Sequence, residues 1–218
     1  LRVECALLTT SCSHALEMAM MALGIAAGDE VILPSFAFVT AASAVVRQGA
    51  QPVFAEIEEA TFNIDPADLE KRLTSRTKAI VAIHYAGQSC RMKELRAVAQ
   101  THNLYLIEDA AQAIGATYRK QPLGTLGDIG CFSFHSTKNV VAGEGGAFVT
   151  NNDSLGKRAE IIREKGTNRS QFLRGEVDKY TWVEVGSSYV ISDLLAALLH
   201  TQLQRLEEIT EARQKIWW

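Results

Sequence analysis

The fold class is indicated most clearly by the segment Gly130-Cys131-Phe132-Ser133-Phe134-His135-Ser136-Thr137-Lys138-Asn139. Its short apolar run ends in polar residues, presents one lysine and is followed by the glycine-rich turn Gly143-Glu144-Gly145-Gly146. A second apolar run, Leu104-Tyr105-Leu106-Ile107, ends in Glu108-Asp109. Short runs that are apolar nearly throughout are typical of strands covered on both faces, as in a parallel sheet. The chain is therefore interpreted as an α/β protein whose central strands end in polar residues.

Short β-rich runs alternate with longer helical patterns along the rest of the chain, which indicates a parallel sheet with crossover helices. Strands are expected at 31–33, 52–56, 79–84, 104–108, 130–134 and 147–150. Helices are expected at 14–23, 39–47, 66–73, 92–102, 154–165 and from 191 to near the end. Residues 168–180 are polar and aperiodic, which favours a long loop. The predicted fold is a three-layer α/β/α sandwich with a mainly parallel sheet, in one domain over 1–218.

Composition limits the kinds of partner that the chain can have. The 218 residues carry a formal net charge of −3, which gives no general attraction to nucleic acid or to an anionic membrane. Four scattered cysteines without a CxxC pair are interpreted as reduced thiols of a cytoplasmic protein. The five histidines show no metal-ligand spacing. The sequence opens inside an expected strand and closes inside an expected helix, so we expect a piece of a longer protein.

Lys138 and Asp109 are the candidate catalytic residues. A lysine after a strand is ordinarily a solvated side chain, but here glycines and small hydroxyl residues flank it and would let a flat cofactor approach closely. Pyridoxal phosphate (PLP) chemistry needs a lysine for the Schiff base and a carboxylate beside the pyridinium nitrogen. Asp109 could simply cap the next helix, or it could supply that carboxylate. Glu108 should point to the opposite face of the strand, so Asp109 is the better candidate.

Further residues could line the same site. Thr10-Ser11-Cys12-Ser13-His14 precedes the first expected helix and is either an ordinary cap or an anion site for the cofactor phosphate. Ser133 would add a hydroxyl, and Gln112 could reach the phenolic oxygen of the ring. Phe36 or Phe38 could be core residues, or could stack on a planar cofactor.

In combination these segments resemble the nucleotide-sugar aminotransferases, a PLP-dependent family with the aspartate-aminotransferase fold (fold type I). The resemblance is carried in order by 10–16, 28–34, 63–65, 107–112, 127–134, 138–139 and 143–146. Within the family, 163–170 and 186–189 resemble the enzymes that transfer an amino group from glutamate to C4 of dTDP-4-keto-6-deoxyglucose. The resemblance implies that the chain is the large PLP-binding domain, without the N-terminal segment and the small C-terminal domain of the family.

The resemblance also implies roles for single residues. Lys138 matches the Schiff-base lysine, Asp109 the partner of the pyridinium nitrogen, and Gln112 the residue near the ring hydroxyl. The phosphate cradle is matched by Cys12, Ser13 and Ser133, and the aromatic that stacks on the ring by Phe38. Ser188 stands where many relatives have an asparagine that reaches the phosphate of the neighbouring subunit. A homodimer with a shared site is therefore expected, with 168–180, including Arg169 and Arg174, reaching across.

Two other functions remain open at this point. Sugar dehydratases of the same fold replace the lysine with histidine, and Lys138 argues against that group. A truncated relative could instead fold and bind PLP without turnover.

Overall fold

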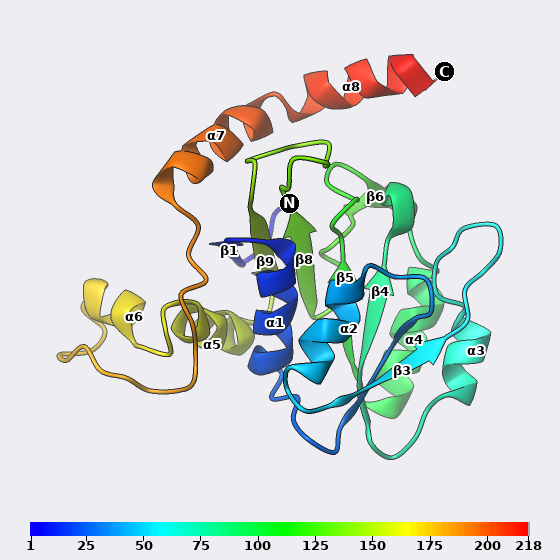
Figure 1. The fold of residues 1–218 in the computed structure, drawn as a ribbon, viewed down its shortest axis with the longest axis horizontal. Coiled ribbons are helices and arrows are strands. Elements are labelled where there is room, and N and C mark those ends of the chain that lie inside the picture. The colour runs from blue at the N-terminus through cyan, green and yellow to red at the C-terminus, as the bar shows by residue number, and fades with distance from the viewer. Residues whose placement is uncertain (218) are drawn as a thin grey trace.

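The computed structural model describes residues 1–217 and contains a seven-stranded sheet between two layers of helices (Figure 1). The strands are β1 (Cys5–Thr9), β2 (Glu30–Pro34), β3 (Gln51–Ala55), β4 (Thr77–Ile83), β5 (Tyr105–Asp109), β8 (Ile129–Ser133) and β9 (Gly146–Thr150). Their order is β1-β9-β8-β5-β4-β2-β3. Only β9 runs antiparallel to its neighbours β1 and β8, and the other pairs are parallel. The mainly parallel sheet and all six expected strands are confirmed.

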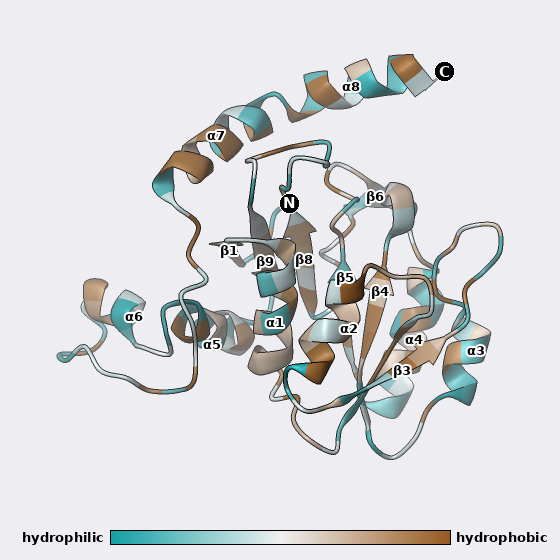
Figure 2. Cartoon of the chain, in the orientation of Figure 1, coloured by the Kyte–Doolittle hydropathy of each residue, from teal (hydrophilic) through white to brown (hydrophobic). Residues whose placement is uncertain are grey.

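Alternation along the strands builds a core on each face of the sheet. Val31 and Leu33 of β2 belong to one buried cluster, and Ile32 between them belongs to the other. The first cluster is covered by α1 (Cys12–Ala22), α2 (Val39–Val46) and α5 (Asp153–Arg163). The second is covered by α3 (Pro66–Lys71) and α4 (Met92–His102). Burial on both faces explains why strands such as β4 and β8 are brown, and therefore hydrophobic, in Figure 2.

The C-terminal part differs from the expectation. Residues 168–180 are not a plain loop, because they contain the short helix α6 (Arg169–Leu173). The Asn168 side chain holds the base of this segment by bonding Lys179 O and Thr181 N. The single helix expected after 191 is two helices, α7 (Asp193–Gln204) and α8 (Leu206–Trp217). Arg205 leaves the helical conformation between them, with φ −105° and ψ 16°.

Two small elements were not expected from the sequence. A hairpin of β6 (Thr117–Tyr118) and β7 (Gln121–Pro122) precedes β8, and a single 3-10 turn, Tyr85–Gly87, follows β4. The helices α7 and α8 lie along one side of the molecule (Figure 1), and Leu199 of α7 belongs to the second buried cluster. Within residues 1–217, no helix combines the length and the apolar character needed to cross a bilayer.

Candidate active site

Four strand ends meet at one edge of the sheet. Asp109 of β5 lies opposite Cys131 of β8, two residues before the end of that strand. Ser133, the last residue of β8, lies opposite Gly146, which in turn lies opposite Thr9 of β1. Neighbouring strands are about 4.8 Å apart, so these ends form one continuous edge. Ligands of open α/β sheets bind at this carboxyl edge.

The N-terminus of α1 lies directly on this edge. The Ser11 side chain caps the helix by accepting from His14 N at 3.1 Å, which leaves the N–H groups of Cys12 and Ser13 outside the helix's own bonding. A Cβ on Gly146 would lie 2.3–2.5 Å from backbone atoms of Ser11 and Cys12. Only glycine therefore lets α1 approach β9 this closely. Free N–H groups at a helix N-terminus provide a site for a phosphate.

Asp109 is a buried carboxylate with spare hydrogen-bonding capacity. The residue keeps only 7% of its surface exposed, and its Oδ1 accepts from Ala111 N at 3.0 Å. Within residues 1–217, Oδ2 receives no hydrogen bond. Burial raises the pKa of Asp109, while the Ala111 N–H and the positive charge of Lys138 act in the opposite direction. A cation placed at Oδ2 would offset the desolvation of this carboxylate.

Glu108 has a different environment, and the expected division between the two carboxylates is confirmed. It is fully buried on the other side of β5, where it accepts from the backbone N–H groups of Gly124, Leu126 and Gly127 at 2.6–2.8 Å. It also bonds His84 Nε2 at 2.8 Å. Nδ1 of His84 accepts from Cys90 N, so the ring proton lies on Nε2 and is donated to Glu108. Four donors occupy Glu108, and it fastens loops instead of facing a ligand.

Lys138 lies in the connection between β8 and β9, which runs over residues 134–145. The loop is closed by Phe134 N to Gly145 O at 2.8 Å and by Ala142 N to Phe134 O at 2.7 Å. Lys138 N itself donates to His135 O at 2.9 Å. The side chain is half-buried, and its charge acts on the pKa of both Asp109 and Cys12. The lysine is therefore close enough to the buried carboxylate and to the N-terminus of α1 for its charge to act on both.

The remaining predicted residues near this edge have defined geometry. Gln112 Oε1 accepts from Ala86 N at 2.7 Å, so its amide nitrogen is left as a donor. Ser133 is buried at the end of β8. Burial raises the pKa of the Cys12 thiol well above its ordinary value, so this side chain stays neutral. Cys12 would therefore contribute its backbone N–H to an anion site, and Ser13 could add a hydroxyl.

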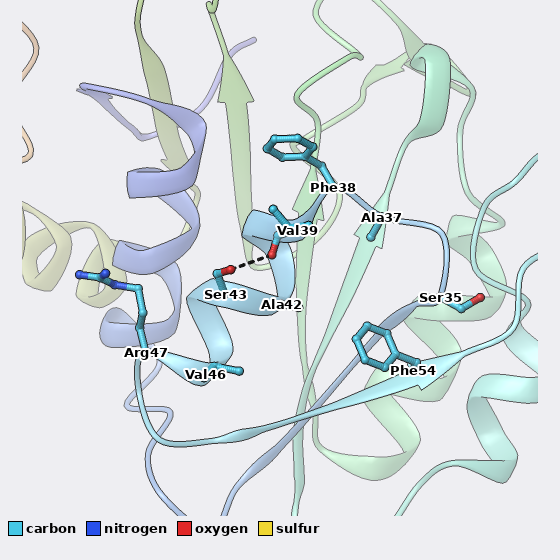
Figure 3. Close-up of a pocket in the computed structure, with 9 residues that line it drawn as sticks. All are labelled: Ser35, Ala37, Phe38, Val39, Ala42, Ser43, Val46, Arg47 and Phe54. Atoms are coloured by element: carbon cyan, nitrogen blue, oxygen red, sulfur yellow. Dashed lines mark hydrogen bonds between the residues drawn. The ribbon is translucent and has the colours of Figure 1, made fainter.

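Two further predicted residues, Phe38 and Ser188, are more exposed than the others. Phe38 precedes α2 and is 74% exposed, and it lines an open hollow of about 680 Å³ between α2 and β3 (Figure 3). Figure 3 shows its ring at the opposite end of α2 from Val46. Ser188 is exposed and forms a backbone bridge with Glu164. Arg174, which was expected to reach across to a neighbouring subunit, pairs within its own chain with Glu160 and Glu176 at 2.9 and 2.7 Å.

These groups fit PLP. The cofactor presents an aldehyde for an amine, a ring nitrogen for a carboxylate and a phosphate for a helix N-terminus, and Lys138, Asp109 and α1 offer these partners.

Sequence reasoning missed Gly146 as the residue that admits α1, and His84 as the partner of Glu108. A glycine at the first position of a strand was the available signal for the first. In the part of the chain that the structure describes, no group of three or more His, Cys, Asp and Glu could hold a metal ion.

Comparisons with known proteins agree with this geometry. Residues 1–218 match the DegT/DnrJ/EryC1/StrS aminotransferase family. The chain is 41% identical over 214 residues to the spore coat polysaccharide biosynthesis protein SpsC of Bacillus subtilis (strain 168), covering 97% of this chain and 55% of that protein. It is 41% identical over 202 residues to the GDP-perosamine synthase of Caulobacter vibrioides, covering 93% and 53%.

A solved structure shows the same fold. The crystal structure of 3-amino-5-hydroxybenzoic acid synthase superposes with a TM-score of 0.91 at 33% identity, covering 99% of this chain and 55% of that one. The chain thus spans about half the length of the curated relatives it matches. The match over every residue and the shared fold lead to one conclusion: this chain belongs to the DegT/DnrJ/EryC1/StrS aminotransferase family.

Proposed function

We propose that this chain is the PLP-binding part of an aminotransferase that acts on nucleotide-linked sugars. The observation that carries the proposal is the convergence of Lys138, Asp109 and the N-terminus of α1 at one edge of the sheet. PLP, when bound, supplies an aldehyde that captures amines and a ring that accepts electrons. The family that the chain belongs to points to the same chemistry.

Each residue has one task in this proposal. The N–H groups of Cys12 and Ser13, with the hydroxyls of Ser13 and Ser133, bind the phosphate dianion at the positive end of α1. The Asp109 carboxylate would orient the ring and would favour its protonated nitrogen through a charge-assisted hydrogen bond.

Lys138 Nζ would be the nucleophile toward the aldehyde, and the same amine would be the group that takes and returns a proton during turnover. Gln112 Nε2, which the Ala86 bond leaves as a donor, would donate to an acceptor on the ring.

The substrate is a finer part of the same proposal. The similar proteins include one named for polysaccharide biosynthesis and one named for GDP-perosamine. We propose that the amino donor is an amino acid, glutamate, and that the acceptor is the 4-keto group of a deoxysugar of the dTDP-4-keto-6-deoxyglucose type. The segments 163–170 and 186–189 support this choice through their resemblance to enzymes of that specificity.

The exposed apolar side chains near this edge are the basis on which we propose a homodimer with a shared site. Phe38 and Val39 are 74% and 68% exposed, although both are large and apolar. A second copy that covers them would let Phe38 stack on the cofactor and let Ser188 reach the neighbouring phosphate site. We further propose that the protein acts in the cytoplasm.

Lys138→Ala tests the proposal directly. The wild-type chain should develop a visible absorbance band when PLP is added, and borohydride should bleach that band and fix the cofactor to the chain. Lys138→Ala should lack the band and keep its fold, as judged by circular dichroism. Lys157→Ala, at an exposed lysine paired with Asp153 at 2.7 Å, is the matched control and should behave as wild type. Peptide mapping that finds the reduced adduct on another lysine would overturn the assignment.

A further inference from the structure

Three aromatic side chains outside the candidate active site pack together at the carboxyl edge of the sheet. The ring centroids of Phe36 and Tyr85 lie 5.2 Å apart, those of Phe36 and Phe62 5.4 Å, and those of Phe62 and Tyr85 5.7 Å. We refer to these three residues as the aromatic cluster. They come from the segments that follow β2, β3 and β4. Because these strands are parallel to β5, the cluster lies at the same edge of the sheet as Asp109.

The backbone holds the aromatic cluster in a fixed arrangement. Phe62 has φ 58°, a left-handed conformation that is uncommon for a bulky residue. It is maintained by Phe62 N donating to Glu58 O at 2.8 Å and by Glu58 N donating to Asn63 O at 2.9 Å. The buried Asn63 side chain accepts from Tyr85 N at 3.0 Å and so joins the loop of Phe62 to the turn of Tyr85. Strain that the surroundings maintain in this way is concentrated at functional sites.

The aromatic cluster is both exposed and connected to the candidate active site. Phe36 and Phe62 each keep 45% of their surface exposed, so the rings do not simply fill a core. Ala86, the residue after Tyr85, donates its N–H to Gln112 Oε1 at 2.7 Å. The turn that presents Tyr85 is therefore fastened to a residue of the proposed cofactor site.

We infer that the aromatic cluster binds the planar base of the nucleotide-sugar substrate by stacking, an inference that rests on the proposed function. Aromatic rings stack on any base, because every base has a π-face. The sheet order β8-β5-β4-β2-β3 places the strands that lead to the cluster two to four spacings from the strand that leads to Lys138, which is about 10–19 Å. In a nucleotide sugar, the sugar ring, the diphosphate and the ribose separate the reacting carbon from the base. The base must therefore bind away from Lys138, as the cluster does.

The experiment measures binding of dTDP to the PLP-loaded chain by calorimetry, with inorganic pyrophosphate as a probe that lacks the base. Phe62→Leu and Tyr85→Leu each remove a ring and keep an apolar side chain. Both should weaken dTDP binding about tenfold and leave pyrophosphate binding unchanged. Tyr85→Phe keeps the ring and should bind dTDP as wild type does. Tyr105→Leu removes an aromatic that is 41% exposed at the opposite edge of the sheet, and it should also leave dTDP binding unchanged.

Unchanged dTDP affinity in Phe62→Leu and Tyr85→Leu would overturn the inference, and so would a wild-type chain that does not bind dTDP. Loss of thermal stability or a change in oligomer mass without a change in dTDP affinity would show that the rings serve the fold or a subunit contact, which also overturns it. The PLP titration of the same wild-type sample reports separately on the proposed function. A chain that binds PLP but fails the dTDP comparison loses only the inference about the base.

Discussion

Replacing Gly146 with alanine tests whether close contact between α1 and β9 creates the phosphate site. The added Cβ would lie 2.3 Å from Ser11 C, 2.4 Å from Cys12 N and 2.5 Å from Ser11 O. Ordinary van der Waals contact begins at 3.4 Å, so the overlap is about 1 Å. All three atoms belong to the backbone and cannot rotate away. The N-terminus of α1 must therefore move away from the sheet by roughly that distance.

Two magnitudes follow from this displacement. Overpacking of a tightly packed contact reduces stability by about 1–3 kcal/mol. For a chain of 218 residues each kcal/mol corresponds to about 2–4 °C, so the melting temperature should fall by about 2–12 °C. A misplacement of about 1 Å in an active site can reduce the reaction rate by about 100-fold. We therefore expect PLP to bind 10- to 100-fold more weakly to Gly146→Ala, an order-of-magnitude expectation on the same basis.

The assay combines a PLP titration, followed by visible absorbance, with thermal melts of the protein without PLP. Gly127→Ala is the matched control, because its Cβ would lie 2.4 Å from Leu106 O near the amino end of the sheet. It should lose comparable stability but keep its PLP affinity within about threefold, or about 0.7 kcal/mol. If Gly146→Ala is destabilised and still binds PLP as tightly as wild type, the position of α1 does not set the phosphate site.

Two further predictions concern the neighbouring carboxylates. Burial raises the pKa of Asp109, so in the absence of PLP the folded chain keeps the carboxyl proton to a higher pH than the unfolded chain does. The stability that the protonated Asp109 contributes is therefore lost as the pH rises through the folded-state pKa. When PLP is absent, Asp109→Asn should therefore have a higher melting temperature than wild type at neutral pH, and the difference should shrink toward pH 4. The PLP-loaded variant should lose most of its transaminase rate. Equal melting temperatures of the two proteins at both pH values would contradict this reasoning. Glu108→Ala leaves four buried donors, including His84 Nε2, without their acceptor and should reduce stability by about 3–5 kcal/mol in urea unfolding. A loss below about 1 kcal/mol would show that water replaces the carboxylate.

The strands were predictable because the physical cause of each strand is local. Apolar runs such as Ala79–Ile83 can be buried only between two helical layers, so composition alone marks them as central strands. The reversed direction of β9 has no such mark within the strand, whose sequence Gly146–Thr150 is as apolar as its parallel neighbours. The signal lies in the connection instead. Residues 134–145 show no helical pattern, and a parallel neighbour would need a crossover helix.

The C-terminal elements were predicted less well because their causes are not local. Nothing in the sequence at Arg205 breaks a helix, since neither glycine nor proline stands there. Leu199 of α7 is buried, whereas Leu194 of the same helix is 85% exposed. A helix that makes few tertiary contacts needs no strict spacing of apolar residues, so the sequence does not show where the helix ends. The same reasoning applies to α6, where contacts made by the Asn168 side chain stabilise a polar segment.

The pair Glu108-Asp109 shows how far the candidate site could be inferred from the sequence. Strand geometry alone sends the two carboxylates to opposite faces of the sheet, and the structure confirms this division. A carboxylate is available for a ligand only if the rest of the chain brings it few hydrogen-bond donors. The donors that occupy Glu108 lie 16 to 24 residues away along the sequence. Glu108 meets four donors and Asp109 meets one. The availability of Asp109 is thus a property of the closed loops around β5, and the burial that raises its pKa is the same burial that would make a bound cation stabilising there.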